Sequence, residues 1–248
     1  MTVKNIFDFL NSLYPCDTAC DFDNVGLLIG DMQTEVKKAI ISLDCTHSAL
    51  KKAIKNNCQL IITHHPIIFS PIKKLISGDI RYELIKNGIS VISMHTNMDI
   101  ADMGVTDCLC KALELKEIEP VLASDGFLLR KGETTPLSPS ELALQIKAKL
   151  GGSVKFNDIN KKISKVLVCS GSGGDFIEDV IPSSCDALIT SEVKHHQYLR
   201  AEELGISVFD AGHFNTEDVI VEKLKEILSE KFKNTEFLTD HTSSIKHI

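Results

Sequence analysis

Short apolar runs alternate with helical patterns along most of the chain, and this alternation is the feature that most constrains its fold. After a predicted helix at residues 5–13, buried strands are predicted at residues 39–43, 59–63 and 89–94. The helices between and after them are predicted at residues 48–56, 80–86 and 104–115. Continuous apolar strands joined by helices indicate a parallel sheet with both faces covered.

The alternation is interrupted once and then resumes. Between about residues 117 and 135 the periodicity weakens, and prolines and glycines cluster there, as is typical of a boundary between lobes. Beyond it, predicted strands are residues 165–169, 187–190 and 207–210, and predicted helices are residues 140–150, 175–181, 197–204 and 216–231. The sequence therefore predicts an α/β fold of two similar lobes, residues 1–120 and 121–248, with mostly parallel sheets flanked by helices.

Composition narrows the class of protein and of partner. No apolar run approaches the roughly 18 residues of a membrane span, and the N-terminus lacks the apolar block of a secretion signal. We therefore expect a cytoplasmic protein with no membrane partner. The formal net charge of −7 argues against nucleic acid as the main partner, because binding to phosphate backbones needs clustered Lys and Arg. A small-molecule partner is expected instead.

The eight cysteines predict neither a disulfide framework nor a zinc knuckle. A chain of 248 residues has enough core to fold without disulfides. Cys16 and Cys20 have C-x3-C spacing and Cys108 and Cys110 have C-x-C spacing, whereas compact zinc sites use C-x2-C. Most of the cysteines are expected to be small buried side chains.

Three clusters of imidazole and carboxylate follow predicted strands. They are T-H-H-P at residues 63–66, M-H-T-N-M-D at residues 94–99 and D-A-G-H-F-N-T-E at residues 210–217. In parallel α/β sheets, ligands bind beyond the carboxyl ends of the strands, where loops carry the reactive groups. These positions are the candidate functional site.

The spacing inside the clusters is compatible with a shared ion. Consecutive strand residues point to opposite faces, but Pro66 keeps His65 out of the helical region, and a turning backbone there can direct both His64 and His65 into one cleft. His213 and Glu217 lie four residues apart and share one face if a helix begins near His213. Asp99 adds a second carboxylate. Imidazoles with carboxylates suit Zn, Mn, Fe or Ni better than Ca. The alternative is that His64 and His65 cap a strand while His213 bonds a carbonyl.

The sequence alone leaves two alternative interpretations for each of two further stretches. The glycine-rich C-S-G-S-G-G-D at residues 169–175 follows a strand and opens a helix, so it is either a tight turn or a cradle for an anion. His195 and His196 follow another strand in an E-x2-H-H arrangement, and they either line the same cleft or lie on the surface.

Five motifs together resemble one family. They are D-N-V-G-L-L-I-G (residues 23–30), T-H-H-P-I-I-F (63–69), H-T-N-M-D (95–99), S-E-V-K-H-H (191–196) and D-A-G-H-F-N-T-E (210–217). The chain resembles the GTP cyclohydrolase type 2 homologue family, also called the NIF-three-like family, in its short form without the inserted extra domain. The match spans nearly the whole chain in the family's order. Phe22 stands where many members have Trp, and Ser191 stands where Gly is common.

The resemblance implies a two-lobed α/β subunit, a dinuclear metal centre in the cleft between the lobes, and assembly into a toroidal homohexamer. It implies two divalent transition-metal ions per subunit, Zn, Fe, Mn or Ni. The family's metal ligands carry over onto His64, His65, Asp99, His213 and Glu217. His95 matches a position beside the metals and is the candidate catalytic residue.

Two classes of function fit these expectations. The first is a metal-dependent hydrolase that activates water against a small nucleotide-like or phosphorylated substrate, since an incomplete protein shell leaves coordination positions for water or substrate. The second is a non-catalytic role in metal handling, or as a scaffold or regulatory hexamer that binds a ligand or a partner. The family's name does not decide between them, because the chemistry has to be argued from the site.

Overall fold

A computed structural model of the chain describes residues 1–246 and divides into two compact units. The first unit is Met1–Ala101 together with Ile220–Ser244, and the second consists mainly of Asp102–Val219. The predicted division into residues 1–120 and 121–248 differs from this grouping. The chain returns to the first unit through α9 (Val219–Lys231) and β11 (Glu236–Asp240), because β11 pairs in parallel with β2 (Lys38–Ser42).

The first unit contains one five-stranded sheet in the order β1-β4-β3-β2-β11. Its remaining elements are α1 (Val3–Leu13), the 3-10 helix η1 (Cys16–Thr18), β1 (Gly26–Ile29), α2 (His47–Lys55), β3 (Leu60–Thr63), α3 (Ile80–Lys86), β4 (Ser90–Ser93) and α4 (Thr96–Ile100). Every neighbouring pair in the sheet is parallel except β1 with β4. The predicted parallel sheet is therefore confirmed here, and β1 is an antiparallel edge strand that the sequence did not predict.

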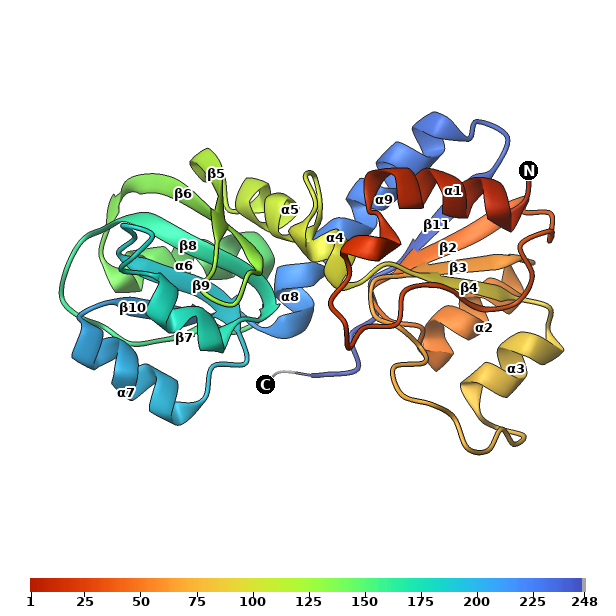
Figure 1. The fold of residues 1–248 in the computed structure, drawn as a ribbon, viewed down its shortest axis with the longest axis horizontal. Coiled ribbons are helices and arrows are strands. Elements are labelled where there is room, and N and C mark those ends of the chain that lie inside the picture. Colours follow the sequence, from red (N-terminus) through yellow and green to blue (C-terminus); the bar gives the residue numbers. More distant parts are fainter. Residues whose placement is uncertain (247–248) are drawn as a thin grey trace. The chain divides into compact units, whose positions relative to one another are not determined.

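Helices cover both faces of this sheet (Figure 1). Side chains alternate between the faces, so Ile40, Ile61 and Val91 lie on one face with Leu50 of α2 and Leu84 of α3 in one hydrophobic cluster. On the ribbon, α1 and α9 lie on the opposite face (Figure 1). Strands buried on both faces explain why these runs are continuously apolar.

The second unit contains a six-stranded sheet in the order β5-β6-β8-β9-β10-β7. Its elements are α5 (Val105–Ala112), β5 (Lys116–Leu122), β6 (Leu128–Leu137), α6 (Pro139–Leu150), β7 (Lys155–Phe156), β8 (Ile163–Ser172), the 3-10 helix η2 (Gly174–Asp179), β9 (Ala187–Ser191), α7 (His195–Leu204), β10 (Ser207–Asp210) and α8 (His213–Glu217). The strands β8, β9 and β10 are parallel, whereas β5, β6 and β7 pair antiparallel.

Alternate residues of the central strands fill two cores in this unit. Val166 and Val168 pack with α5 and α6, whereas Leu167 and Cys169 pack with η2 and α7. By the same alternation along β9, Ile189 belongs to the core with α5 and α6, and Leu188 belongs to the core with η2 and α7. The predicted α/β class with two helix-flanked sheets is thus confirmed.

Residues 117–135, interpreted from the sequence as a boundary between lobes, lie within the second unit. These residues form the hairpin of β5 and β6 at one edge of the second sheet. Most of β5 is exposed, and Pro120 sits within it, which only an edge strand tolerates. A strand with so few buried positions lacks the apolar run that identifies the central strands, and the sequence therefore did not predict it. With this hairpin, the second sheet has more antiparallel pairs than predicted.

The predicted helices are present with two adjustments. The helix expected at residues 175–181 is the 3-10 helix η2, and the helix expected at residues 216–231 is divided into α8 and α9 at Asp218. All eight cysteines are free thiols and five are buried, as expected for small core side chains. Among residues 1–246, no helix combines the length and apolar character that crossing a bilayer requires.

Candidate metal centre

The end of β3 brings two consecutive imidazoles together. His64 is fully buried and follows Thr63, the last residue of β3. The Thr63 hydroxyl donates to the carbonyl of His65 at 2.9 Å, which holds the chain in a turn as it leaves the strand. The two rings therefore lie on the same side, with centroids 4.9 Å apart, instead of pointing to opposite faces as they would within a strand.

A third imidazole and a carboxylate come from the end of β4. The ring centroid of His95 lies 5.1 Å from that of His64 and 5.5 Å from that of His65. Ligand nitrogens of these three residues lie within 4.8 Å of one another. Asp99, on the short helix α4, places a carboxylate oxygen 3.6 Å from His64 Nε2 and is mostly buried. Residues 64, 65, 95 and 99 thus form one group within the first unit.

Hydrogen bonds at Nδ1 fix the tautomer of the three imidazoles. His64 Nδ1 lies 2.9 Å from the carbonyl oxygen of Met94, which can only accept, so Nδ1 carries the proton. His65 Nδ1 lies 2.7 Å from the Asp44 carboxylate, and His95 Nδ1 lies 2.8 Å from the Asp23 carboxylate. In each neutral ring the lone pair is consequently on Nε2. Carbonyl and carboxylate partners of this kind orient the imidazoles of metal sites in proteins.

Asp23 is anchored more strongly than an ordinary carboxylate. Its side chain is fully buried and also accepts from the Thr96 hydroxyl at 2.6 Å and from the Thr96 backbone N–H at 3.0 Å. Burial alone would raise the pKa of Asp23, but the hydrogen bonds from His95 and Thr96 outweigh it and hold that pKa below its ordinary value. A permanently charged Asp23 keeps the His95 ring in one orientation.

The second unit supplies an imidazole and a carboxylate on α8. His213 and Glu217 are one helical turn apart, and their Nε2 and Oε2 atoms are separated by 3.0 Å. Glu217 is almost completely buried, and Glu192 lies 3.2 Å from His213 Nδ1. The prediction that residues 213 and 217 share one face of a helix is confirmed.

The glycine stretch after β8 makes room for Glu217. Gly171 has a positive φ of +63°, and a Cβ at this position would lie 2.1 Å from Glu217 Oε1. The Gly171 N–H donates to Thr216 Oγ1 at 3.1 Å, which ties the turn to α8. Residues 169–175 were interpreted either as a tight turn or as an anion cradle, and the close approach of Gly171 to α8 supports the tight turn. The turn also positions the carboxylate of Glu217.

His195 and His196 lie on the surface of the second unit. Both begin helix α7 and are exposed. Exposed imidazoles at a helix start need no metal to explain them, so the surface interpretation of this pair is the one that the structure favours.

Three carboxylates of the site were missed as functional residues. Asp44 lies two residues beyond the end of β2, at the same sheet edge as His64, so the strand-end rule that selected the three clusters would also have selected it. Asp23 precedes β1, which runs antiparallel to β4, and its position at this edge follows only once β1 is known. Glu192 follows β9 directly, and the strand-end rule applies to it as well.

The donor set fits a first-row divalent ion in its chemistry. Each unit supplies imidazole nitrogen and carboxylate oxygen, the ligands that Zn, Mn, Fe and Ni share, and lacks the all-oxygen shell that Ca prefers. Two features are typical of a preorganised metal site. The imidazoles are held in one tautomer by their Nδ1 partners, and Gly171 leaves space for the buried carboxylate of Glu217.

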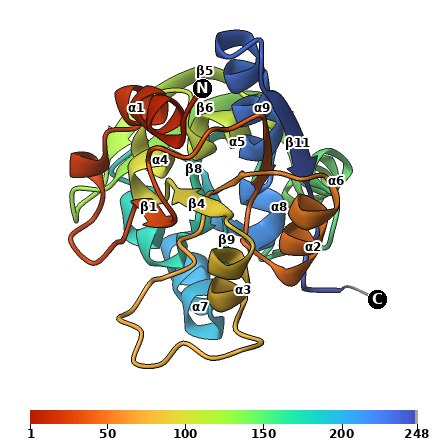
Figure 2. The same ribbon diagram turned by 90° about the vertical axis from the view of Figure 1, so that its right-hand side faces the viewer.

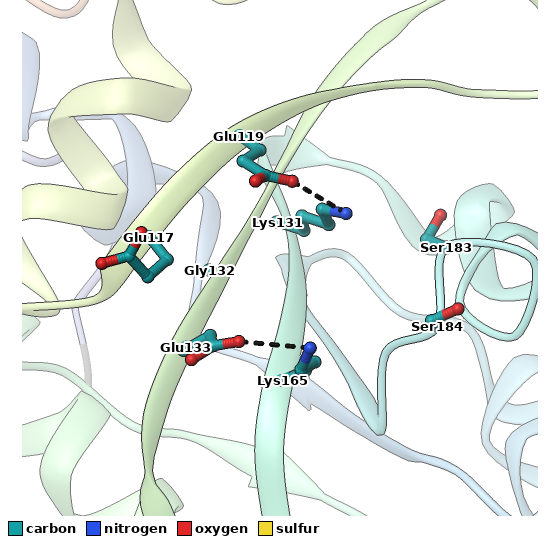
Figure 3. Close-up of a pocket in the computed structure, with 8 residues that line it drawn as sticks. All are labelled: Glu117, Glu119, Lys131, Gly132, Glu133, Lys165, Ser183 and Ser184. Atoms are coloured by element: carbon teal, nitrogen blue, oxygen red, sulfur yellow. Dashed lines mark ion pairs between the residues drawn. The ribbon is translucent and has the colours of Figure 1, made fainter.

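A separate hollow of ≈ 220 Å³ lies on the second unit over β5, β6 and β8 (Figure 3). Both of its lysines are paired with glutamates, Lys131 with Glu119 at 2.9 Å and Lys165 with Glu133 at 3.2 Å. Cations that are neutralised in this way do not form an anion site, and the hollow contains no imidazole.

Comparison with known proteins identifies the family. The model of the Duf34/NIF3 (NGG1p interacting factor 3) family matches residues 1–246. The chain belongs to this family.

Relatives of this Duf34/NIF3 member align over nearly their full length. A protein of Clostridium acetobutylicum named GTP cyclohydrolase 1 type 2 homolog is 32% identical, over 98% of this chain and 97% of the relative. A Helicobacter pylori protein named GTP cyclohydrolase 1 type 2 is 34% identical, over 94% of this chain and 97% of the relative. The crystal structure of a Staphylococcus aureus protein matches with a TM-score of 0.93 at 27% identity, over 100% of this chain and 99% of that one. The resemblance inferred from the five motifs is therefore confirmed.

Proposed function

We propose that this Duf34/NIF3 member is a dinuclear metal-dependent hydrolase acting on a small nucleotide-like or phosphorylated substrate. The ions would be two divalent transition metals per subunit, held by His64, His65 and Asp99 of the first unit and by His213 and Glu217 of the second. This five-residue set is carried over from the family resemblance, and the observations that support it lie within each unit.

The observation that carries the proposal is the common orientation of the imidazoles. Met94 and Asp44 accept from the Nδ1 atoms of His64 and His65, which leaves Nε2 as the ligand nitrogen in both rings. Fixing a ring in this way costs side-chain freedom before any ion binds. A strand cap does not require both rings to be held in the same tautomer by Nδ1 acceptors, so the arrangement favours a metal site over the capping alternative.

The chemistry divides between the ions and the protein. Divalent ions bound at this donor set supply Lewis acidity and lower the pKa of water toward neutrality. His95 is the proposed catalytic residue: its Nδ1 donates to Asp23, and its Nε2 is free to accept a proton from water and return it to the leaving group. Asp23 stabilises the charged imidazole that forms in between.

Turnover is the experiment that separates the hydrolase from a non-catalytic metal protein. Protein loaded with Zn or Mn is assayed against a panel of nucleotides and phosphoesters, beside the same protein treated with EDTA. We expect hydrolysis only in the loaded sample, and we expect His95→Gln to retain its metal while losing at least about 100-fold in rate. His47→Gln, which removes an exposed imidazole at the start of α2, is the matched control. Full metal loading with no turnover across the panel would favour the metal-handling or scaffold role.

The homohexamer is also a proposal and is supported by the family resemblance alone. Light scattering at micromolar concentration should return about six times the chain mass of 27.4 kDa. A monomeric mass would contradict it and would leave the metal proposal unaffected.

A further inference from the structure

Two exposed aromatic rings form a corner on the first unit. The ring centroids of Phe22 and Phe69 are 6.2 Å apart, with their planes inclined at 50°. Phe22 is 65% exposed and Phe69 is 51% exposed. Large apolar rings in contact with each other yet open to water are uncommon on a surface unless something covers them, and we call this pair the aromatic corner.

The aromatic corner is held in place by hydrogen bonds on both of its sides. Asp23, next to Phe22, is bound to His95 and Thr96. The side chain of Asn24 donates to the carbonyl of Ile68, the residue before Phe69, at 2.6 Å. Phe69 belongs to the long segment between β3 and α3, which extends away from the sheet in Figure 2. The two rings therefore sit on segments that are tied to each other and to the β4 end.

The corner continues directly into the imidazole group. The ring of Phe69 lies 6.3 Å from that of His95 in an edge-on arrangement, and His95 in turn contacts the rings of His64 and His65. A molecule resting on the corner thus has its far end beside the proposed metal ligands. Such a molecule needs a flat apolar part at one end and a polar part at the other.

We infer that the aromatic corner is the subsite for the flat heteroaromatic ring of the substrate. Aromatic rings bind such partners by offset stacking or edge-to-face contact, and every nucleobase offers a face of this kind. The inference rests on the proposed function and narrows it: the substrate is nucleotide-like, and a phosphorylated molecule without a ring is a poor ligand. Phe22 and Phe69 are specificity-determining residues, whereas His95 and the metal ligands receive the polar end.

Calorimetric titration with nucleoside monophosphates and with ribose 5-phosphate tests the subsite. The two kinds of probe share a sugar phosphate and differ in the ring. We expect AMP, GMP, CMP and UMP each to bind at least about 5-fold more tightly than ribose 5-phosphate. Phe22→Leu and Phe69→Leu keep an apolar side chain but remove the ring, so each should weaken nucleotide binding by about 5- to 100-fold and leave ribose 5-phosphate within twofold. Phe69→Tyr, which keeps the ring, should restore the preference.

The control is Tyr82→Leu, which removes an exposed ring on α3 and should change neither affinity. Equal binding of nucleotides and ribose 5-phosphate overturns the inference, as does equal weakening of both by the two Phe variants. A change in mass by light scattering in these variants, with the ring preference intact, also overturns it, because the corner would then be a contact between copies of the chain.

The titrations are repeated on EDTA-treated protein so that the two proposals can fail separately. Stacking does not require the ions, so we expect the ring preference to persist after EDTA treatment. If the treated protein keeps this preference but takes up no Zn or Mn when it is reloaded, the corner is supported and the metal-dependent hydrolase is refuted. Normal metal loading without a ring preference overturns the corner alone.

Discussion

Replacing Glu217 by glutamine removes one negative charge and almost no volume. The side chain is nearly completely buried, with its Oε2 atom 3.0 Å from His213 Nε2. As a metal ligand, the carboxylate attracts a cation at close range. Two unit charges about 4 Å apart interact by roughly 4 kcal/mol at an effective dielectric constant of 20, and a dication in contact gains at least that much. Since about 1.4 kcal/mol is tenfold, Glu217→Gln should weaken the affinity for at least one ion by about 1000-fold or more.

A different outcome is expected if Glu217 has only a structural role and binds no metal. A carboxylate that only interacts with a helix terminus contributes about 0.3–1 kcal/mol of stability and leaves metal content unchanged. The assay is metal stoichiometry of folded protein, wild type beside variant, after equal dialysis against a mild chelator, with circular dichroism to confirm folding. Glu222→Gln is the matched control, because Glu222 also pairs with a histidine, His241, at 2.9 Å and lies outside the site. If Glu217→Gln retains its ions with unchanged affinity, residue 217 is not a ligand and the reasoning is refuted.

Two further substitutions test the residues that support the ligands. Asp44→Ala removes the oxygen that accepts from His65 Nδ1, so it should weaken metal binding by about 10- to 100-fold with little loss of stability. The control is Asp125→Ala, which removes an acceptor in a turn, and equal metal affinities of the two variants would contradict this. Gly171→Ala should cost at least about 1–2 kcal/mol more in the free energy of unfolding than Gly88→Ala. Both glycines have a similar positive φ, but only the Cβ at residue 171 would meet Glu217, so equal urea midpoints would show that the crowding is relieved without cost.

The central strands and the histidine clusters could be predicted because they follow one physical rule. Strands such as β3 and β4 are buried on both faces, so their apolar runs are unmistakable, and the residues just beyond their carboxyl ends are the ones that meet at one sheet edge. His64, His65, His95 and Asp99 were found in this way, and the structure brings them together.

The remaining features depend on contacts that sequence periodicity does not encode. The hairpin of β5 and β6 buries few side chains, and so its strands carry little pattern. The return of the chain to the first unit rests on pairing between β11 and β2, which are separated by most of the sequence. Asp23 could not be assigned to His95 because 72 residues separate them and the intervening edge strand β1 was not predicted.

Elemental analysis of the purified chain tests the central claim most directly. Protein prepared without added chelator, and again after reconstitution with Zn or Mn, is freed of loosely bound ions by gel filtration and its metal content is measured against protein concentration. The account predicts about two divalent transition-metal ions per chain, the number that the family resemblance implies for the five imidazole and carboxylate ligands. A reproducible absence of metal in both preparations would contradict it.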